Sequence, residues 1–142
     1  MYKHLLIATD GSELAQKAVD QGLALAKALH SQATVITVTE PWVAVAPDVP
    51  PVGYEDGVAA GASKVLEGVN ATARMLGTSC ATVHVKDRYP AEGIVETAKE
   101  KECDLIVLAS HGWRGLRRFI LGSVANEVVT HSSVPVLICG LM

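Results

Sequence analysis

Short runs of β-branched and apolar residues alternate along this chain with longer stretches whose apolar residues recur every three to four positions. The short runs have the length and composition of strands, and the longer stretches have the period of amphipathic helices. Strands separated by helices form right-handed βαβ units, which build a parallel sheet with helices on both faces. The alternation therefore predicts a doubly wound α/β fold.

The patterns and the turn residues between them also predict where each element lies. Strands are expected at 4–9, 33–39, 81–85, 105–109 and 134–139. Helices are expected at 13–29, 55–76, 90–101 and 124–131. The first helix is expected to bury its periodic apolar residues, Leu14, Ala18, Leu23, Leu25, Ala26 and Leu29. The segment Glu40–Tyr54 holds four of the six prolines and is expected to be a loop.

Composition limits the classes of protein to which the chain can belong. Its 142 residues, 49% of them hydrophobic, are enough for a single domain, residues 1–142, with one aliphatic core. A net charge of −3 argues against a general nucleic-acid binder, which is usually strongly basic. No apolar run is long enough for a membrane helix, and the one at Leu5–Ala8 is too short for a signal peptide. The three cysteines lack CxxC spacing, which favours reduced thiols in a cytoplasmic protein.

The segment between the fourth strand and the last helix combines glycines with basic side chains. It runs from Ala109 to Val124 and holds three of the five arginines. Glycines let backbone amides approach phosphate oxygens, and a helix N-terminus adds free N–H donors and a favourable dipole. Ligands of doubly wound sheets bind beyond the carboxyl ends of the strands, where this segment begins. A phosphate-binding loop and an ordinary surface loop fit the spacing equally well.

Several standard signatures are absent. The sequence has no G-x-x-x-x-G-K-[ST], which excludes a P-loop NTPase, and no G-x-G-x-x-G after the first strand, which argues against a Rossmann dinucleotide site. Asp10 is a lone carboxylate at the end of the first strand, without the paired acids of a response regulator. Ser123 lacks the G-x-S-x-G elbow of serine hydrolases. Cys80 and His84 are only two potential metal ligands, and two ligands do not make a zinc site.

Three stretches together resemble the universal stress protein family in its ATP-binding form. The first strand ends in Ala8-Thr9-Asp10-Gly11-Ser12, similar to the family's Thr-Asp-x-Ser turn. The loop fits the pattern G-x2-G-x9-G-[ST] at Gly112 and Gly122-Ser123, with Ala109 in place of the first glycine. Pro135-Val136-Leu137-Ile138 fits the family's final strand. The resemblance covers essentially the whole chain.

The resemblance implies a fold like that of the adenine nucleotide alpha-hydrolases. This fold is α/β and doubly wound, with a mainly parallel five-stranded sheet in the order 3-2-1-4-5 and helices on both faces. The family also implies a homodimer paired through the C-terminal edge strand. The implied function is that of a stress-response sensor or regulator that binds ATP, or AMP or ADP, with Mg²⁺ held only through the phosphates.

Two other functions remain open at this point. One is a slow ATPase or autophosphorylating protein that uses Ser123 or His111, although no residue stands out as a general base for phosphoryl transfer. The other is a dimeric interaction module of the same family that binds no nucleotide. Retention of Gly112, Gly122 and Ser123 argues against this module, and Ala109 argues slightly for it.

By resemblance, the nucleotide is expected at the ends of three strands. The adenine and ribose are expected near Ala8, Thr9, Asp10 and Val38. The ribose and first phosphate are expected near Leu108, Ala109 and His111. The other phosphates are expected at Gly112, Gly122, Ser123, Val124 and Ala125. The chemistry agrees, since a carboxylate can accept from ribose hydroxyls and glycine amides can donate to phosphate. A valine at position 122 is expected to displace the phosphates while leaving the fold largely intact.

Overall fold

The computed structural model of the protein describes residues 1–42, 49–111 and 121–140. The strands within them are β1 (His4–Ala8), β2 (Gln32–Thr39), β3 (Ala81–Lys86), β4 (Leu105–Ala109) and β5 (Val136–Cys139). The helices are α1 (Glu13–Leu29), α2 (Tyr54–Met75), α3 (Pro90–Glu100) and α4 (Ser123–His131). Each predicted strand and helix is therefore present. None of the described helices is long and apolar enough to cross a membrane.

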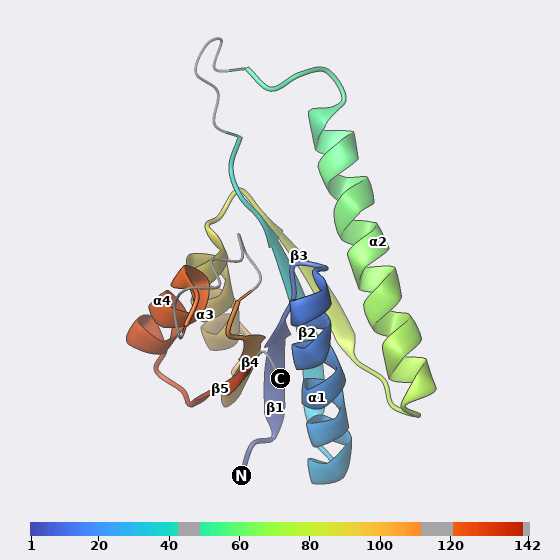
Figure 1. Cartoon of the computed structure of the whole chain (residues 1–142), viewed down its shortest axis with the longest axis vertical. Coiled ribbons are helices and arrows are strands. Elements are labelled where there is room, and N and C mark those ends of the chain that lie inside the picture. Colours follow the sequence, from blue (N-terminus) through green and yellow to red (C-terminus); the bar gives the residue numbers. More distant parts are fainter. Residues whose placement is uncertain (43–48, 112–120, 141–142) are drawn as a thin grey trace.

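The strands form one sheet in the order β3-β2-β1-β4-β5, and each neighbouring pair is parallel. Helices α1 and α2 cover one face of the sheet, and α3 and α4 cover the other (Figure 1). The predicted doubly wound fold and its strand order are confirmed. The chain leaves β1 toward one face and β4 toward the other, so the edge beyond β1 and β4 is the switch point where ligands of such sheets bind.

Burial of alternate residues fixes the register of the central strand. Leu5 and Ile7 pack with α1 and α2, whereas Leu6 and Ala8 pack with α3 and α4. All four side chains are at most 1% exposed. Full burial of a Leu or Ile side chain stabilises a fold by roughly 1.5–3 kcal/mol. A slip of β1 by one residue would move each of these side chains to the opposite face of the sheet, so burial specifies a single register. This register places the carboxyl ends of β1, β2 and β4 at the same edge of the sheet.

The last strand begins two residues later than predicted. The predicted strand includes Val134 and Pro135, but β5 starts at Val136. Proline has no N–H with which to extend the ladder, and the N–H of Val134 donates to Ser132 Oγ (3.1 Å) instead. The Pro135 carbonyl still accepts from the N–H of Ile106 (3.0 Å), which ties the start of β5 to β4.

Candidate functional site

Predicted site residues from three segments converge at the carboxyl edge of the sheet. Ala8 in β1 is paired with Ile36 in β2, two residues before Val38. Beyond the end of β1, the Thr9 N–H donates to the Ile36 carbonyl (3.0 Å). On the other side Ile7 is paired with Val107, one residue before Leu108. Of these residues the structure thus brings together Ala8, Thr9, Val38, Leu108 and the adjoining Asp10 and Ala109.

A tight turn holds Asp10 at this edge. Its Oδ1 accepts the N–H of Ser12 (2.9 Å), and Thr9 Oγ1 accepts the N–H of Gly11 (3.1 Å). Gly11 has φ +84°, and a Cβ there would lie 2.8 Å from Val65 Cγ2 in α2, so this position requires glycine. Asp10 is half-buried, and its Oδ2 makes no hydrogen bond within the described part of the chain. This oxygen is therefore available to accept from a ligand hydroxyl.

The end of β4 carries two buried polar side chains. Ser110 and His111 are 5% and 4% exposed, and His111 Nδ1 lies 3.2 Å from Ser110 Oγ. The other ring nitrogen, His111 Nε2, is fully buried and has no hydrogen-bond partner among residues 1–42, 49–111 and 121–140. A buried polar atom without a partner costs about 1–3 kcal/mol. His111 therefore has an unused donor or acceptor at the predicted phosphate region.

Ser110 was not predicted as a site residue, yet it organises this region. Its N–H donates to the Cys139 carbonyl (2.8 Å) in β5, and its own carbonyl accepts the N–H of Gly122 (2.6 Å). The sequence offers only a weak signal for this role, namely a polar residue directly after a buried strand. The Ser110 carbonyl thus joins the end of β4 to the start of α4.

The structure changes the interpretation of Gly122. Its φ is −68°, outside the left-handed region, so backbone conformation does not demand glycine. A Cβ there would instead lie 2.7 Å from the Ser110 oxygen and 3.4 Å from His111 Cα. The expectation that a side chain at position 122 leaves the fold largely intact is therefore wrong, because the chain's own backbone already fills that space.

Helix α4 presents free amides to the same region. Helical bonding begins when the Asn126 N–H donates to the Gly122 carbonyl (3.0 Å), which leaves the N–H groups of Ser123, Val124 and Ala125 without helical acceptors. The N-cap, Gly122, has no side chain to cap them. The His111 ring lies against this N-cap, with Cδ2 3.6 Å from the Cβ position of Gly122. Gly112, also a predicted phosphate contact, lies outside the described residues.

The two potential metal ligands in the sequence, Cys80 and His84, each contact a neighbouring side chain. His84 Nε2 lies 2.7 Å from Thr39 Oγ1, and burial lowers the pKa of His84, with a further contribution from Lys86. Cys80 contacts Asn70, with Sγ 3.9 Å from its Oδ1, and burial raises the pKa of this thiol. The described ranges contain no group of three His, Cys, Asp or Glu side chains that could hold a metal ion.

Comparison with known proteins identifies the family. The model of the universal stress protein family matches residues 1–140. Universal stress protein YxiE of Bacillus subtilis is 31% identical over 147 residues, covering 97% of this chain and 99% of that protein. The structure of hypothetical protein MJ0577 superposes with a TM-score of 0.83 at 25% identity, covering 100% of this chain and 98% of that one. A universal stress protein in complex with cAMP superposes at 0.76 with 28% identity, over 97% of each chain. The chain therefore belongs to the universal stress protein family.

Proposed function

We propose that this protein binds an adenine nucleotide, ATP in particular, at the carboxyl edge of β1 and β4. In this proposal it is a single-domain, cytoplasmic regulator of the stress response whose state depends on the bound nucleotide. The observation that carries the proposal is the buried Nε2 of His111, which has no partner within the described residues and lies near the N-terminus of α4, where no side chain caps the helix. A similar protein of the family, 28% identical, was solved in complex with cAMP, itself an adenine nucleotide.

The phosphate end of the proposed site combines two kinds of donor. The amides of Ser123, Val124 and Ala125, which have no acceptor among the described residues, lie at the positive end of the helix dipole, which favours anions. His111 Nε2 would add a donor that finds its partner when phosphate is present, because a buried nitrogen gains most from such a bond. Mg²⁺ would be held through the phosphates, since the described residues contain no metal-binding group of three side chains.

The nucleoside end of the proposed site is less charged. Asp10 Oδ2 would accept from ribose hydroxyls while Oδ1 keeps its bond to Ser12. Val38 and Ala8 are 7% and 1% exposed, so in this proposal they form the apolar support behind the base and not an open surface. Ala109 is only half-buried, and its methyl group adds little bulk where the family pattern has glycine. Each of these groups binds or orients, and none of them is placed here as a base for phosphoryl transfer.

Two substitutions test the proposal by calorimetry with ATP. Asp10→Ala should weaken binding by about 1–3 kcal/mol, or roughly fivefold to 150-fold. Asp20→Ala is the matched control, because this α1 carboxylate also accepts one local hydrogen bond, from Gln16 Nε2 (2.8 Å), away from the strand ends. Equal ATP affinities in both variants and the parent would remove Asp10 from the site.

His111→Leu separates a ligand-binding role from a structural one. Leucine fills similar space and removes the buried Nε2, but it also removes the contact of Nδ1 with Ser110 Oγ (3.2 Å); because these two effects oppose one another, the urea midpoint should change little. ATP affinity should fall at the same time. A lower midpoint with unchanged affinity would show that His111 serves the fold alone. Mass spectrometry of nucleotide released from the denatured, purified protein would separate ATP from AMP and from no nucleotide, and labelled ATP would reveal hydrolysis.

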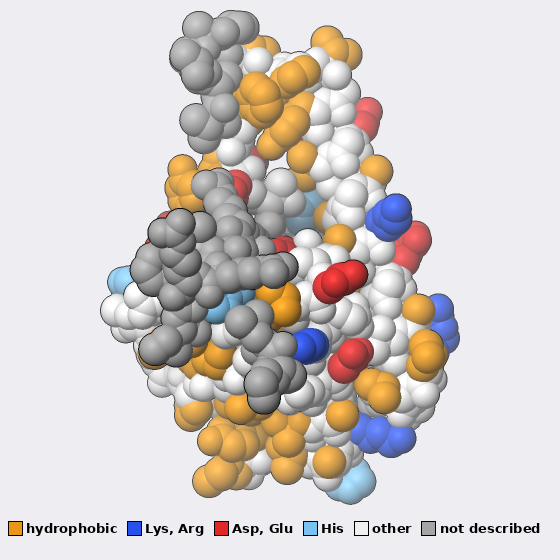
Figure 2. Space-filling model, in the orientation of Figure 1, with side chains coloured by type: hydrophobic (Ala, Val, Ile, Leu, Met, Phe, Trp, Pro, Cys, Tyr) orange, Lys and Arg blue, Asp and Glu red, His pale blue; other side chains and the backbone are white. Residues whose placement is uncertain are grey.

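We also propose that two copies pair through β5. This strand has β4 on one side and is an edge strand of the sheet. Its side chains are largely apolar, with Leu137 39% exposed and Val136 and Ile138 half-buried. Figure 2 shows apolar side chains at the lower left of the molecule, the side on which Figure 1 places β5, and at its lower end, where Figure 1 places the N-terminus. An identical strand would satisfy the free backbone groups of such an edge and cover this surface.

A further inference from the structure

A cavity of about 410 Å³ opens between the first turns of α3 and α4, beside the end of β2. Ser123 and Val124 form part of its wall, and the proposed function assigns these two residues to the phosphates. The cavity therefore continues from the phosphate region toward α3. Its volume falls within the roughly 300–1,000 Å³ of small-molecule pockets.

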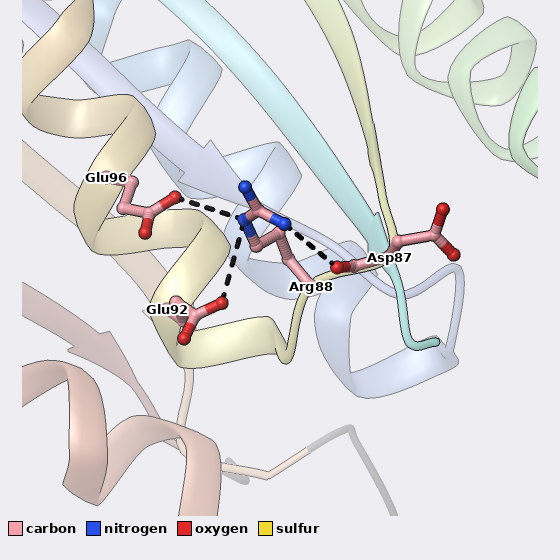
Figure 3. Close-up of polar contacts among 4 residues, drawn as sticks. All are labelled: Asp87, Arg88, Glu92 and Glu96. Atoms are coloured by element: carbon pink, nitrogen blue, oxygen red, sulfur yellow. Dashed lines mark hydrogen bonds and ion pairs between the residues drawn. The ribbon is translucent and has the colours of Figure 1, made fainter. Parts of the chain in front are cut away.

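The wall beyond Ser123 has the wrong charge for further phosphate. Glu92 and Glu127 line it, together with Glu40 at the end of β2. Glu92 is held at this wall by an ion pair, with Oε1 3.6 Å from Arg88 Nε (Figure 3). Carboxylates repel phosphate oxygens, but they accept hydrogen bonds from hydroxyl and amine groups. The far part of the cavity thus suits a neutral group rich in donors.

The same wall offers an aromatic surface. Tyr89, directly before α3, lines the cavity and is 54% exposed. Its side chain makes no hydrogen bond to the helix that it precedes, so the ring is not used as a cap. An exposed aromatic ring can stack on a base, and such stacking tolerates any base because each has a π-face. A ribose with its hydroxyls and a base together match the carboxylates and the ring.

A cation site is the main alternative for these carboxylates. A metal ion would need several of them within reach of one point. No group of three His, Cys, Asp or Glu side chains in the described ranges could hold a metal ion, and this includes the three glutamates of the wall. Arg88 already lies between Glu92 and Glu96, with its Nε 3.6 and 3.4 Å from their oxygens. We therefore take Glu92 and Glu127 as acceptors for hydroxyl groups and not as metal ligands.

We infer that this cavity receives a second nucleoside, so that the ligand class is a dinucleoside polyphosphate. Its first nucleoside would lie at the β1–β2 edge, its phosphates would cross the amides of α4 beside His111 Nε2, and its second nucleoside would face Tyr89 and Glu92. The inference rests on the proposed function, which supplies the first nucleoside and the phosphates. It assigns the ligand's far end to residues that a mononucleotide does not need.

Calorimetry on the full chain with three ligands tests this assignment. Diadenosine tetraphosphate should bind about tenfold more tightly than ATP, the gain expected from one stacked base. Adenosine tetraphosphate has the same number of phosphates but no second nucleoside, and it should bind like ATP. Comparison of these ligands separates the second nucleoside from the added phosphate charge.

Three variants locate the extra affinity. Tyr89→Ala and Glu92→Gln should each reduce the affinity for diadenosine tetraphosphate toward that for ATP, with ATP affinity unchanged. Glu96→Gln is the matched control, because it lies one turn further along α3 and contacts the same Arg88 Nε but does not line this cavity. It should leave both affinities unchanged. Melting curves verify that each variant is folded.

The outcomes distinguish this inference from the proposed function. Equal affinities of the parent for ATP and diadenosine tetraphosphate would overturn the second nucleoside and leave ATP binding standing. An equal loss of both affinities in Tyr89→Ala would overturn it too, because Tyr89 would then belong to the first nucleoside. If none of the three ligands binds, the proposed function itself fails and the inference fails with it.

Discussion

Replacing Gly122 by alanine tests most directly the contact between Ser110, after β4, and Gly122, the N-cap of α4. The added Cβ would lie 2.7 Å from the Ser110 carbonyl oxygen, well inside the 3.4–4 Å of ordinary van der Waals contact. Because φ is −68° and ψ is 164°, alanine is free of backbone strain there, and the cost is steric. The nearest atom belongs to backbone that is itself bonded to β5, so it cannot simply move away.

The expected loss of stability can be worked out from these contacts. Overpacking of a well-filled site costs about 1–3 kcal/mol. Relief of the clash would also lengthen the 2.6 Å bond from Gly122 N–H to the Ser110 carbonyl, and a lost hydrogen bond costs about 1 kcal/mol. Gly122→Ala should therefore lower the free energy of unfolding by about 2–4 kcal/mol. This is a large part of the roughly 5–15 kcal/mol that holds most domains folded.

Urea unfolding of two variants and the parent measures this loss. Gly61→Ala is the matched control, because a Cβ at Gly61 in α2 has no atom within 4 Å. An alanine at an exposed position inside a helix should raise stability by about 1 kcal/mol. The two substitutions should thus move the urea midpoint in opposite directions. A Gly122→Ala variant with the midpoint of the parent but without ATP binding would refute the reasoning, since the glycine would then serve the ligand alone.

Three other predictions concern the remaining parts of the fold. Burial acts to raise the pKa of Asp104, but the N–H groups of His4 (3.0 Å) and Lys3 (2.8 Å) donate to its carboxylate and hold its pKa below the ordinary value. A lowered pKa adds stability that is present above about pH 4 and is lost as the pH falls through the pKa of the folded state. Asp104→Asn should therefore lower the urea midpoint at pH 7. The difference in midpoint between this variant and the parent should vanish in strong acid. Burial, together with the Asp104 carboxylate, raises the pKa of Cys103 to about 11, so iodoacetamide at pH 8 should label this thiol only after unfolding; rapid labelling of the folded protein would contradict this. Leu137→Asp should convert the proposed dimer to a monomer in light scattering, whereas Val52→Asp, at an exposed apolar position away from β5, should not.

The local patterns of the sequence predict the elements well because each pattern is a property of one segment. The continuous apolar run 105–109 coincides with β4, and β2 begins at Gln32, one residue before the predicted start of its β-branched run. The order of the strands depends on contacts between segments, and its prediction came from the family resemblance rather than from the patterns. Segment-level reasoning thus reaches the elements but not their arrangement.

The buried face of α1 shows where hydrophobic periodicity fails. Leu29 is predicted to be buried but is 41% exposed, whereas the small residues Ala15 and Gly22 are buried. A Cβ on Gly22 would lie 2.7 Å from Ile7, so the helix packs too closely on β1 for a larger residue at this position. Close approach selects small side chains, and periodicity gives them little weight.

The candidate site also contains some residues that have a local signal in the sequence and some contacts that have none. Asp10 and His111 stand out in the sequence because they follow strands and match a family motif, and their place in a ligand site stays a prediction. The contact of Gly122 with Ser110 and the cavity at Tyr89 cannot be, because each is formed by segments that are separate in the sequence. These features depend on tertiary structure and have no local signal.

The hydrogen bond between Gly122 and Ser110 also closes the segment 111–121 at its neck. The Ser110 end of this bond is tied to β5 by the Ser110 N–H, and the Gly122 end is the N-cap of α4. The joined ends thus belong to the same frame of strands and helices that forms the core. We therefore expect that substitutions between the two ends can change the ligand preference without any redesign of the core, provided that Ser110 and Gly122 are kept.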